Sequence, residues 1–183
     1  MKFKKRGRRI SSGIAIGAKK ELSCKFRVIK EMTNSDRLEV VHLDVWKKNV
    51  KIPCIAVYNP PNNVGYYDVI PCDEICLVFG DFNSPSTRWG YSTTTTAGKN
   101  TEDFVDTCPI ERITSSSAND FTFMNTRGSK TNPDLIFSHV NNSHNVQQSS
   151  IALIGSHGHE VIKITMEDPT KLNVEIRCSC HGT

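Results

Sequence analysis

The stretch 77–83, Leu-Val-Phe-Gly-Asp-Phe-Asn, constrains the fold of this chain most strongly. An apolar run of strand length ends at Gly80, and Asp81 and Asn83 follow with one residue between them. Alternate residues of a strand point to the same side, so the carboxylate and the amide should leave the strand end together. This pair suits metal-assisted phosphate chemistry, because the carboxylate can orient or deprotonate a water and the amide can hold a phosphate oxygen. An Asx-type turn explains the same residues without any function.

Length and composition favour one globular domain. At 183 residues the chain is long enough for one hydrophobic core and short for two. Its 37% hydrophobic and 23% charged residues are typical of a soluble protein. No apolar run approaches the roughly 20 residues that span a bilayer, so no membrane partner is expected. Seven cysteines without a secretion signal predict reduced thiols in an intracellular compartment.

Positive charge gathers at the start of the chain. The first thirty residues hold eleven Lys and Arg against one acid, Glu21, whereas the remainder is net acidic. The basic block at 4–9 either contacts phosphate backbones, acts as a nuclear address, or is a solvated tail. We predict a nuclear protein with a basic tail over 1–11, one domain over 12–168 and a C-terminal tail over 169–183.

Alternating apolar and polar residues predict a chain rich in strands. Residues 50–58 follow 38–46 across a short turn at 47–49, which predicts an antiparallel hairpin. Pro53 in the second run indicates an edge strand or a bulge. Further strands are expected at 13–17, 26–32, 121–124, 135–137, 151–154 and 161–166.

Only one helix is expected, over about 101–108. Thr101 is its predicted N-cap, and Glu102 and Asp103 would lie in the first turn, where negative charge is favourable. Many strands with one helix predict a sheet-based domain of the α/β or α+β class.

Three polar clusters follow or precede predicted strands. They are Asp81 with Asn83, then Asp134, then the Ser-His-Gly-His segment that ends at His159. Each alone is better explained as a polar turn at a strand end. Together they supply the carboxylates, amide and imidazole that phosphodiester hydrolysis needs. Asp134 paired with His159 would fix the tautomer of the imidazole and raise its basicity.

The order of four motifs resembles the endonuclease/exonuclease/phosphatase superfamily, which includes DNase I and the apurinic endonucleases. The motifs are Val-Tyr-Asn-Pro-Pro at 57–61, Gly-Asp-Phe-Asn at 80–83, Asn-Pro-Asp-Leu at 132–135 and Gly-Ser-x-x-His at 155–159. The segment Ser-Thr-Arg-Trp-Gly-Tyr at 86–91 is similar to endonuclease domains of non-long-terminal-repeat retrotransposons, which accompany a reverse transcriptase.

This resemblance implies a sandwich of two mainly antiparallel sheets flanked by helices. It also implies a DNA nick that depends on Mg²⁺ or Mn²⁺ and leaves a 3′ hydroxyl for a reverse transcriptase domain of a longer parent chain. By motif, Asp81 would activate the attacking water, and Asn83 and the Tyr58 hydroxyl would bind the scissile phosphate. Asp134 and His159 would form the dyad that stabilises charge on phosphorus. Asp81 is the nearest candidate for a metal ligand.

Two departures from the family pattern predict weak or absent activity and an incomplete N-terminal half. The family carries an Asn and a metal-binding Glu upstream of the strand that 12–16 resembles, whereas Glu21 and Glu31 lie after it. The family ends on Ser-Asp-His, where this chain has Ser-His-Gly-His at 156–159, so a probable metal-binding carboxylate is missing.

Three alternatives remain open from the sequence. A phosphomonoesterase of the same superfamily would share the core motifs, and a non-catalytic nucleic-acid-binding remnant would show salt-sensitive binding without cleavage. A zinc module is the third, although its pairs have unusual spacing and lie far apart. Its ligands would be Cys72, Cys76, Cys178, Cys180 and His181.

Overall fold

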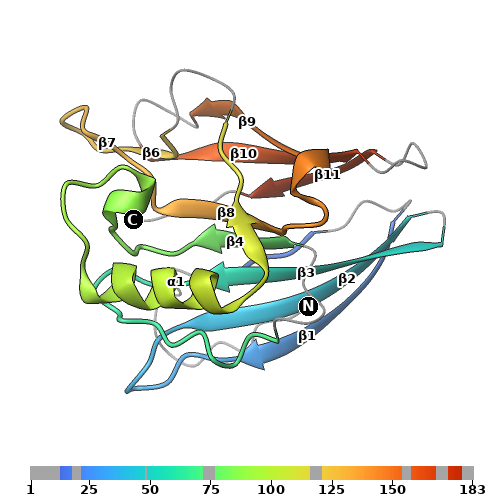
Figure 1. Cartoon of the computed structure of the whole chain (residues 1–183), viewed down its shortest axis with the longest axis horizontal. Helices are drawn as coiled ribbons and strands as arrows, with labels where there is room; N and C mark the ends of the chain where they lie inside the picture. Colours follow the sequence, from blue (N-terminus) through green and yellow to red (C-terminus); the bar gives the residue numbers. More distant parts are fainter. Residues whose placement is uncertain are drawn as a thin grey trace, which may run out of the picture.

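The computed structural model describes residues 13–17, 22–47, 49–71, 77–115, 121–153, 158–167 and 173–178, and Figure 1 shows their arrangement in two sheets. The predicted basic tail and most of the predicted zinc ligands lie outside these residues. The elements are β1 (Ser23–Lys30), β2 (Glu39–Lys47), β3 (Val50–Tyr58), β4 (Leu77–Asp81), a 3-10 turn (Thr87–Trp89), α1 (Thr96–Thr107), β5 (Ile110–Arg112), β6 (Phe123–Met124), β7 (Lys130–Thr131), β8 (Asp134–His139), a second 3-10 turn (Ser143–Asn145), β9 (Val146–Leu153), β10 (Gly158–Glu167) and β11 (Asn173–Cys178).

The first sheet has the strand order β1-β2-β3-β4-β8-β5. All its neighbouring strands are antiparallel except β3 and β4, which run parallel. The predicted hairpin is present, because β2 and β3 pair from Glu39 opposite Tyr58 to Lys47 opposite Val50. Asn49 in its turn has φ of 67°, a left-handed conformation that Asn tolerates better than most residues.

Pro53 lies inside β3, which is an interior strand, so the predicted edge position is wrong. The parallel strand β4 pairs with β3 only from Cys54 onward, and no register shift interrupts the pairing of β3 with β2. Pro53 therefore sits just beyond the end of β4, where its missing N–H costs no bond to that neighbour.

Both faces of the first sheet are buried, because side chains of β3 alternate between two hydrophobic clusters. Ile55 and Val57 pack into a cluster that includes Phe104 and Val105 of α1. Cys54 and Ala56 point to the other face, into a cluster shared with the second sheet. The helix therefore covers one face of the first sheet and the second sheet covers the other, as Figure 1 shows.

The helix begins five residues before the predicted start. Its N-cap is Thr95, whose side chain accepts a hydrogen bond from the Gly98 N–H. Thr101, the predicted cap, is fully buried inside the helix and donates its hydroxyl to the Ala97 carbonyl. The run of threonines at 93–96 offers several equivalent caps, so the sequence pattern alone did not identify the right one.

The second sheet has the order β11-β10-β6-β7, with β9 also paired to β10. Its contribution to the shared core is Ile162, Ile164 and Met166 of β10. Strand β11 lies within the predicted C-terminal tail and pairs with β10 from Ile162 opposite Cys178 onward. The division of the chain into domain and tails otherwise stays a prediction.

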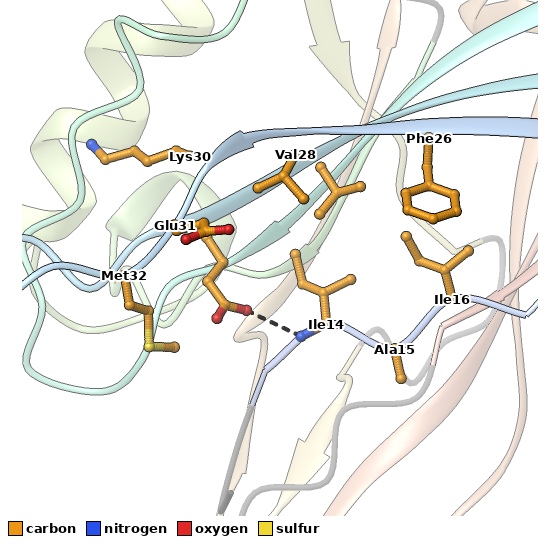
Figure 2. Close-up of a pocket in the computed structure, with 10 residues that line it drawn as sticks. Ile14, Ala15, Ile16, Phe26, Val28, Lys30, Glu31 and Met32 are labelled. Carbon is orange, nitrogen blue, oxygen red and sulfur yellow. Dashed lines mark hydrogen bonds between the residues drawn. The ribbon is translucent and has the colours of Figure 1, made fainter. Parts of the chain in front are cut away.

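The residues 13–17 are not a strand in the structure, contrary to expectation. They border a groove of about 670 Å³ over β1 and β2, where the Ile14 N–H donates to the Glu39 carboxylate, as Figure 2 shows. Two exposed side chains of β1, Phe26 and Val28, give the groove an apolar wall.

Cysteine chemistry differs from expectation at one position. Cys24 is a free thiol, as predicted, but Cys108 at the end of α1 is disulfide-bonded. Within the described ranges, no helix has the length and apolar character to cross a membrane.

Gly80 allows β3 and β4 to approach, and its substitution tests how far the fold depends on that contact. Its φ is 146°, and an added Cβ would lie 1.9 Å from the Val57 carbonyl oxygen, so the backbone itself would have to move. We expect Gly80→Ala to lower the free energy of unfolding by about 3 kcal/mol or more in urea denaturation. Gly128→Ala is the matched control, because Gly128 also has positive φ, 80°, but no atom within 4 Å of an added Cβ. Equal losses in the two variants would contradict the role of the close contact.

Candidate active site

Three of the predicted site residues form a row across the first sheet. In the strand register Tyr58 of β3 lies beside Asp81 of β4, and Asp81 lies opposite Asp134 of β8. Adjacent strands are about 4.8 Å apart, so in-register side chains on one face are direct neighbours. Residues more than fifty positions apart in the sequence are therefore brought together by strand pairing alone.

The row faces the second sheet. Two residues before Tyr58 and Asp81 are Ala56 and Phe79, and two residues after Asp134 is Ile136; all three belong to the core between the sheets. Since side chains repeat on one face every second residue, the three polar residues continue that face beyond the core. The candidate site thus lies at the rim where the two sheets meet.

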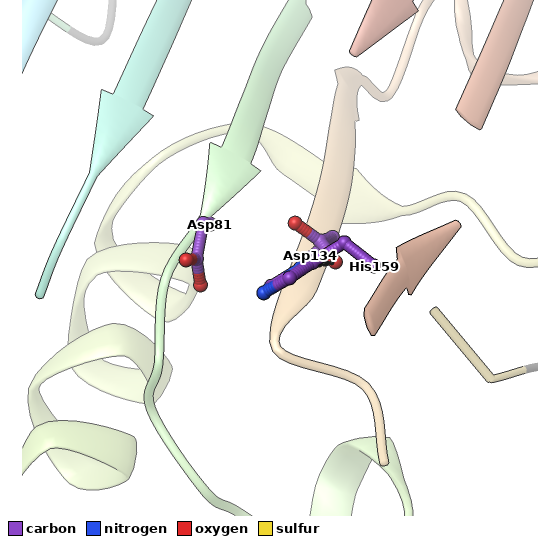
Figure 3. Close-up of side chains that lie close together, drawn as sticks. All are labelled: Asp81, Asp134 and His159. Atoms are coloured by element: carbon purple, nitrogen blue, oxygen red, sulfur yellow. Dashed lines mark hydrogen bonds and ion pairs between the residues drawn. The ribbon is translucent and has the colours of Figure 1, made fainter. Parts of the chain in front are cut away.

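His159 reaches the row from the second sheet. Its Nδ1 lies 2.7 Å from Oδ2 of Asp134, and Figure 3 shows the imidazole and the two carboxylates converging. The ring also packs edge-on against Phe123, with 4.9 Å between ring centroids. Phe123 is the strand partner of His159 in the pairing of β6 with β10. The expected Asp134 and His159 contact is therefore present, and packing as well as hydrogen bonding fixes the ring.

Thr122 joins the two sheets directly beneath this contact. Its hydroxyl accepts a hydrogen bond of 3.1 Å from the backbone N–H of Asp134, and its carbonyl accepts one of 2.7 Å from Glu160 N–H. It is 2% exposed. The sequence analysis did not single out Thr122, because a threonine in a short strand carries no signal of such a role.

Asn83 lies beside the row rather than in it. Its backbone is left-handed, with φ of 41°, and its side-chain amide donates to the Asn59 carbonyl at 3.0 Å. Side-chain and backbone hydrogen bonds from Asn83 also lower the pKa of Asp81. The amide therefore stays close to the carboxylate, as the spacing of the two residues predicts.

Asp81 is the most perturbed carboxylate of the described chain. Burial raises its pKa to about 7, and repulsion from Asp134 adds to this, while His159 and the hydrogen bonds from Asn83 act in the opposite direction. The residue is 3% exposed, and its Oδ1 has no hydrogen-bond partner. A buried carboxylate with an orphaned oxygen marks a place where a cation, water or substrate group would be stabilised.

The carboxylates of Asp134 and Asp81 also raise the pKa of two neighbouring groups, His159 and Tyr91. Burial lowers the pKa of His159, but the hydrogen bond and negative charge of Asp134, with Asp81 beyond it, outweigh that effect and raise the pKa overall. Tyr91 also lies near the site, since burial and then the charges of Asp134 and Asp81 raise the pKa of its phenol. Tyr91 belongs to the 86–91 segment, which the sequence analysis used only to recognise a family.

The residues present fit a divalent cation. One ligand atom each of Asp81, Asp134 and His159 lies within 4.8 Å of the others. Carboxylate oxygens suit Mg²⁺, and a mixture of carboxylate and imidazole suits Mn²⁺. The orphaned Oδ1 of Asp81 adds an unused acceptor to this set. Tyr58, the neighbour of Asp81 in the strand register, is 8% exposed.

The sequence matches the family described as Endonuclease-reverse transcriptase over residues 52–162, more than half of the chain. The chain belongs to this family. The match spans all five predicted site residues: Tyr58 in β3, Asp81 in β4, Asn83 just after β4, Asp134 in β8 and His159 in β10. No curated protein sequence matches the chain.

One solved structure supports the same fold, and a second is less similar. The endonuclease domain of TRAS1, a telomere-specific non-LTR retrotransposon, matches with a TM-score of 0.61 at 14% identity, covering 80% of this chain and 70% of that one. TDP2 of D. rerio, humanized by 14 mutations, matches with a TM-score of 0.46 at 12% identity, covering 74% and 59%. The predicted two-sheet, mainly antiparallel α+β fold of the DNase I type is confirmed.

The raised pKa of Asp81 predicts a stability that falls as pH rises. The folded value is about 7 against an ordinary 3.8, so between these pH values the folded state retains a proton that the unfolded state releases. In chelator, we expect Asp81→Asn to match the wild type near pH 4 and to exceed it by on the order of a few kcal/mol at pH 8. The pKa of His159 is also raised, so His159 adds to the fall in stability as the pH rises above the ordinary pKa of histidine.

Urea denaturation at both pH values measures this difference. Asp106→Asn is the control, because its carboxylate is 58% exposed in an ion pair with Arg88. Equal stabilities of wild type and Asp81→Asn at pH 8 would mean that the surroundings do not destabilise the charged form of the Asp81 carboxylate.

Proposed function

We propose that this chain is a metal-dependent phosphodiesterase domain that nicks DNA, with weak activity because the segment 156–159 lacks the carboxylate of the family's Ser-Asp-His. The observation that carries the proposal is the convergence of Asp81 with the hydrogen-bonded Asp134 and His159 at the rim between the sheets. This set combines a carboxylate with a near-neutral pKa and a held imidazole, which are the groups needed to deprotonate water and stabilise an anion. Membership of the endonuclease family supports the same reaction class.

Each predicted residue has a role that its surroundings permit. Asp81 accepts a proton from the attacking water, since a base works best with a pKa close to the operating pH. Asn83 and the Tyr58 hydroxyl hold oxygens of the scissile phosphate. Asp134 orients His159, and the imidazolium stabilises the negative charge that develops on phosphorus. The water oxygen bonds to phosphorus as the bond between phosphorus and the 3′ oxygen breaks, and the 3′ oxygen takes up a proton from solvent and departs as the free hydroxyl.

A divalent cation, Mg²⁺ or Mn²⁺, would be held by the carboxylates of Asp81 and Asp134, which leaves the protonated His159 available to stabilise charge. Bound there it would supply Lewis-acid stabilisation of the phosphate and of the leaving oxygen. The cation would also relieve the repulsion between the two carboxylates, whose separation in the sheet is set by strand pairing.

The proposed biological setting follows from the family. A nick with a free 3′ hydroxyl would prime a reverse transcriptase domain in a longer parent chain, and chromosomal DNA as substrate would require a nuclear location. Membership of the Endonuclease-reverse transcriptase family supports a retrotransposon origin over a phosphomonoesterase, and the TRAS1 endonuclease domain has a similar fold.

Nicking of supercoiled plasmid tests the proposal. We expect relaxed circles in Mg²⁺ or Mn²⁺ and none in chelator. Asp81→Ala and His159→Ala should each lower the rate by about 100-fold or more, because each removes a group of the general-base or charge-stabilising kind. Asp106→Ala, an exposed carboxylate in α1, should retain the wild-type rate.

The outcomes separate the alternatives that the sequence left open. Salt-sensitive DNA binding without nicking in any metal would favour the non-catalytic remnant. Hydrolysis of a phosphomonoester in preference to plasmid would favour the phosphatase alternative. Nicking that survives both Asp81→Ala and His159→Ala would place the chemistry elsewhere in the chain.

Metal binding can be measured without activity. A ligand that binds only the folded state at a hundred times its Kd adds about 2.7 kcal/mol to the stability, so Mn²⁺ should raise the Tm by several degrees. Asp134→Asn removes a candidate ligand charge and should abolish most of this shift. Asp103→Asn, an exposed carboxylate of α1, should keep it. An equal Tm rise in all three proteins would show that Mn²⁺ binds elsewhere.

A further inference from the structure

Asn59, the residue after Tyr58, is completely buried at the end of β3. Its side-chain Nδ2 donates to the Phe82 carbonyl at 2.8 Å and to the Asn63 carbonyl at 3.3 Å. Its Oδ1 accepts a hydrogen bond of 2.7 Å from Asn63 Nδ2. Both amide hydrogens and the amide oxygen are therefore used, as burial of a polar group requires.

The backbone of Asn59 extends the same set of contacts. Its N–H donates to the Asp81 carbonyl at 2.8 Å, and its carbonyl accepts the side-chain amide of Asn83 at 3.0 Å. Together with the bond to Phe82, one residue is thus bonded to three successive residues, 81–83. We infer that Asn59 is a positioning residue for the proposed nuclease reaction, fixing Asp81 and Asn83 in the orientation that the reaction needs.

The segment after β4 needs such an anchor because it leaves the sheet in an unusual conformation. Asn83 has φ of 41°, a left-handed conformation that is unfavourable for a residue other than glycine. Phe82 is fully buried, and its N–H is already bonded to the Pro133 carbonyl on the other side. The bonds from Asn59 hold the opposite side, so the segment is fixed between the loop after β3 and the residue before β8.

The amide of Asn59 is itself held in one orientation. Asn63 Nδ2 is shared between Asn59 Oδ1 and the Asp36 carboxylate, at 2.7 Å and 2.8 Å. Asp36 is in turn paired with Lys30. Because Asn63 donates to Asn59 Oδ1, the Asn59 nitrogen must face the Phe82 carbonyl. Gly65, with φ of 72°, leaves room for this arrangement, since a Cβ there would lie 3.2 Å from both amide atoms.

Asn59 acts on the chemistry only through its neighbours. Its side chain has no exposed surface, so it does not touch substrate. Loss of the side-chain amide would leave the buried Phe82 carbonyl without this donor, and the backbone carbonyl of Asn59, which accepts the Asn83 amide, would no longer be held in place. A displacement of about 1 Å in a reacting group can cost on the order of 100-fold in rate. The expected loss of nicking rate rests on the proposed function. The placement of Asp81 and Asn83 by Asn59 rests on the hydrogen bonds alone.

A double-mutant cycle tests the inference by single-turnover nicking of a duplex oligonucleotide. We expect Asn59→Ala to lower the rate about 10-fold to 100-fold with little change in DNA affinity, and Asn83→Ala to lower it at least as much. The double variant should be within about 2-fold of Asn83→Ala, because Asn59 works through that residue. Multiplication of the two losses in the double variant would overturn the inference.

Asn100→Ala is the matched control. Asn100 also donates its amide to a backbone carbonyl of the loop after β3, that of Gly65, at 2.9 Å, but does not contact 81–83. It should nick within about 2-fold of the wild type; a loss equal to that of Asn59→Ala would reduce Asn59 to general support of the loop. If Asn59→Ala fails to fold, Asn63→Ala takes its place in the cycle and should show the same non-additivity with a smaller loss.

The side-chain amide signal of Asn83 in a nitrogen–proton correlation spectrum tests positioning without any nicking. It should shift in Asn59→Ala and stay in place in Asn100→Ala. That result in a chain that does not nick DNA would support the positioning role while overturning the proposed function. An unmoved Asn83 signal in Asn59→Ala would overturn the positioning role whether or not the chain nicks DNA.

Discussion

The alignment of Tyr58, Asp81 and Asp134 in one register across β3, β4 and β8 is the constraint on which the candidate site depends. Strand register is all or none, because a slip of one residue would turn each side chain to the opposite face. The parallel pairing of β3 with β4 restricts the sequence most, since Gly80 lies against the Val57 carbonyl with no room for a side chain. The glycine of the Gly-Asp-Phe-Asn motif is therefore a packing requirement that places the aspartate.

The electrostatic repulsion within this alignment is unfavourable for folding, and the same repulsion favours the binding of a positive charge. Two carboxylates in register at the end of buried strands repel each other, and burial adds to the cost of charging them. His159 from the second sheet offsets part of this cost through Asp134, leaving Asp81 with an unpartnered oxygen. A cation, or a proton on the carboxylate itself, is favoured there more than at a solvated carboxylate, and this preference links the raised pKa of Asp81 to the proposed chemistry.

The sequence predicted the members of the site better than the elements that support it. Asp81, Asn83, Asp134 and His159 stand at strand ends with recognisable spacing, and the structure brings them together. The start of α1 at Thr96 was missed because neighbouring threonines are equivalent caps, and β11 was missed because its pairing with β10 is a tertiary event. Asn59 reads as part of an Asn-Pro-Pro turn, and only its burial and bonds distinguish it from any other turn residue. Roles of the site residues stay predictions.

The division of the site between two sheets has a consequence for when the chain can act. Asp81 and Asp134 are placed by pairing within the first sheet, whereas His159 arrives only when β10 docks against it through Ile162 and Ile164. Thr122 is bonded to both sides of that junction. A nascent or partly folded chain would thus hold the carboxylates without the imidazole, and cutting of DNA would be withheld until the hydrophobic core had closed.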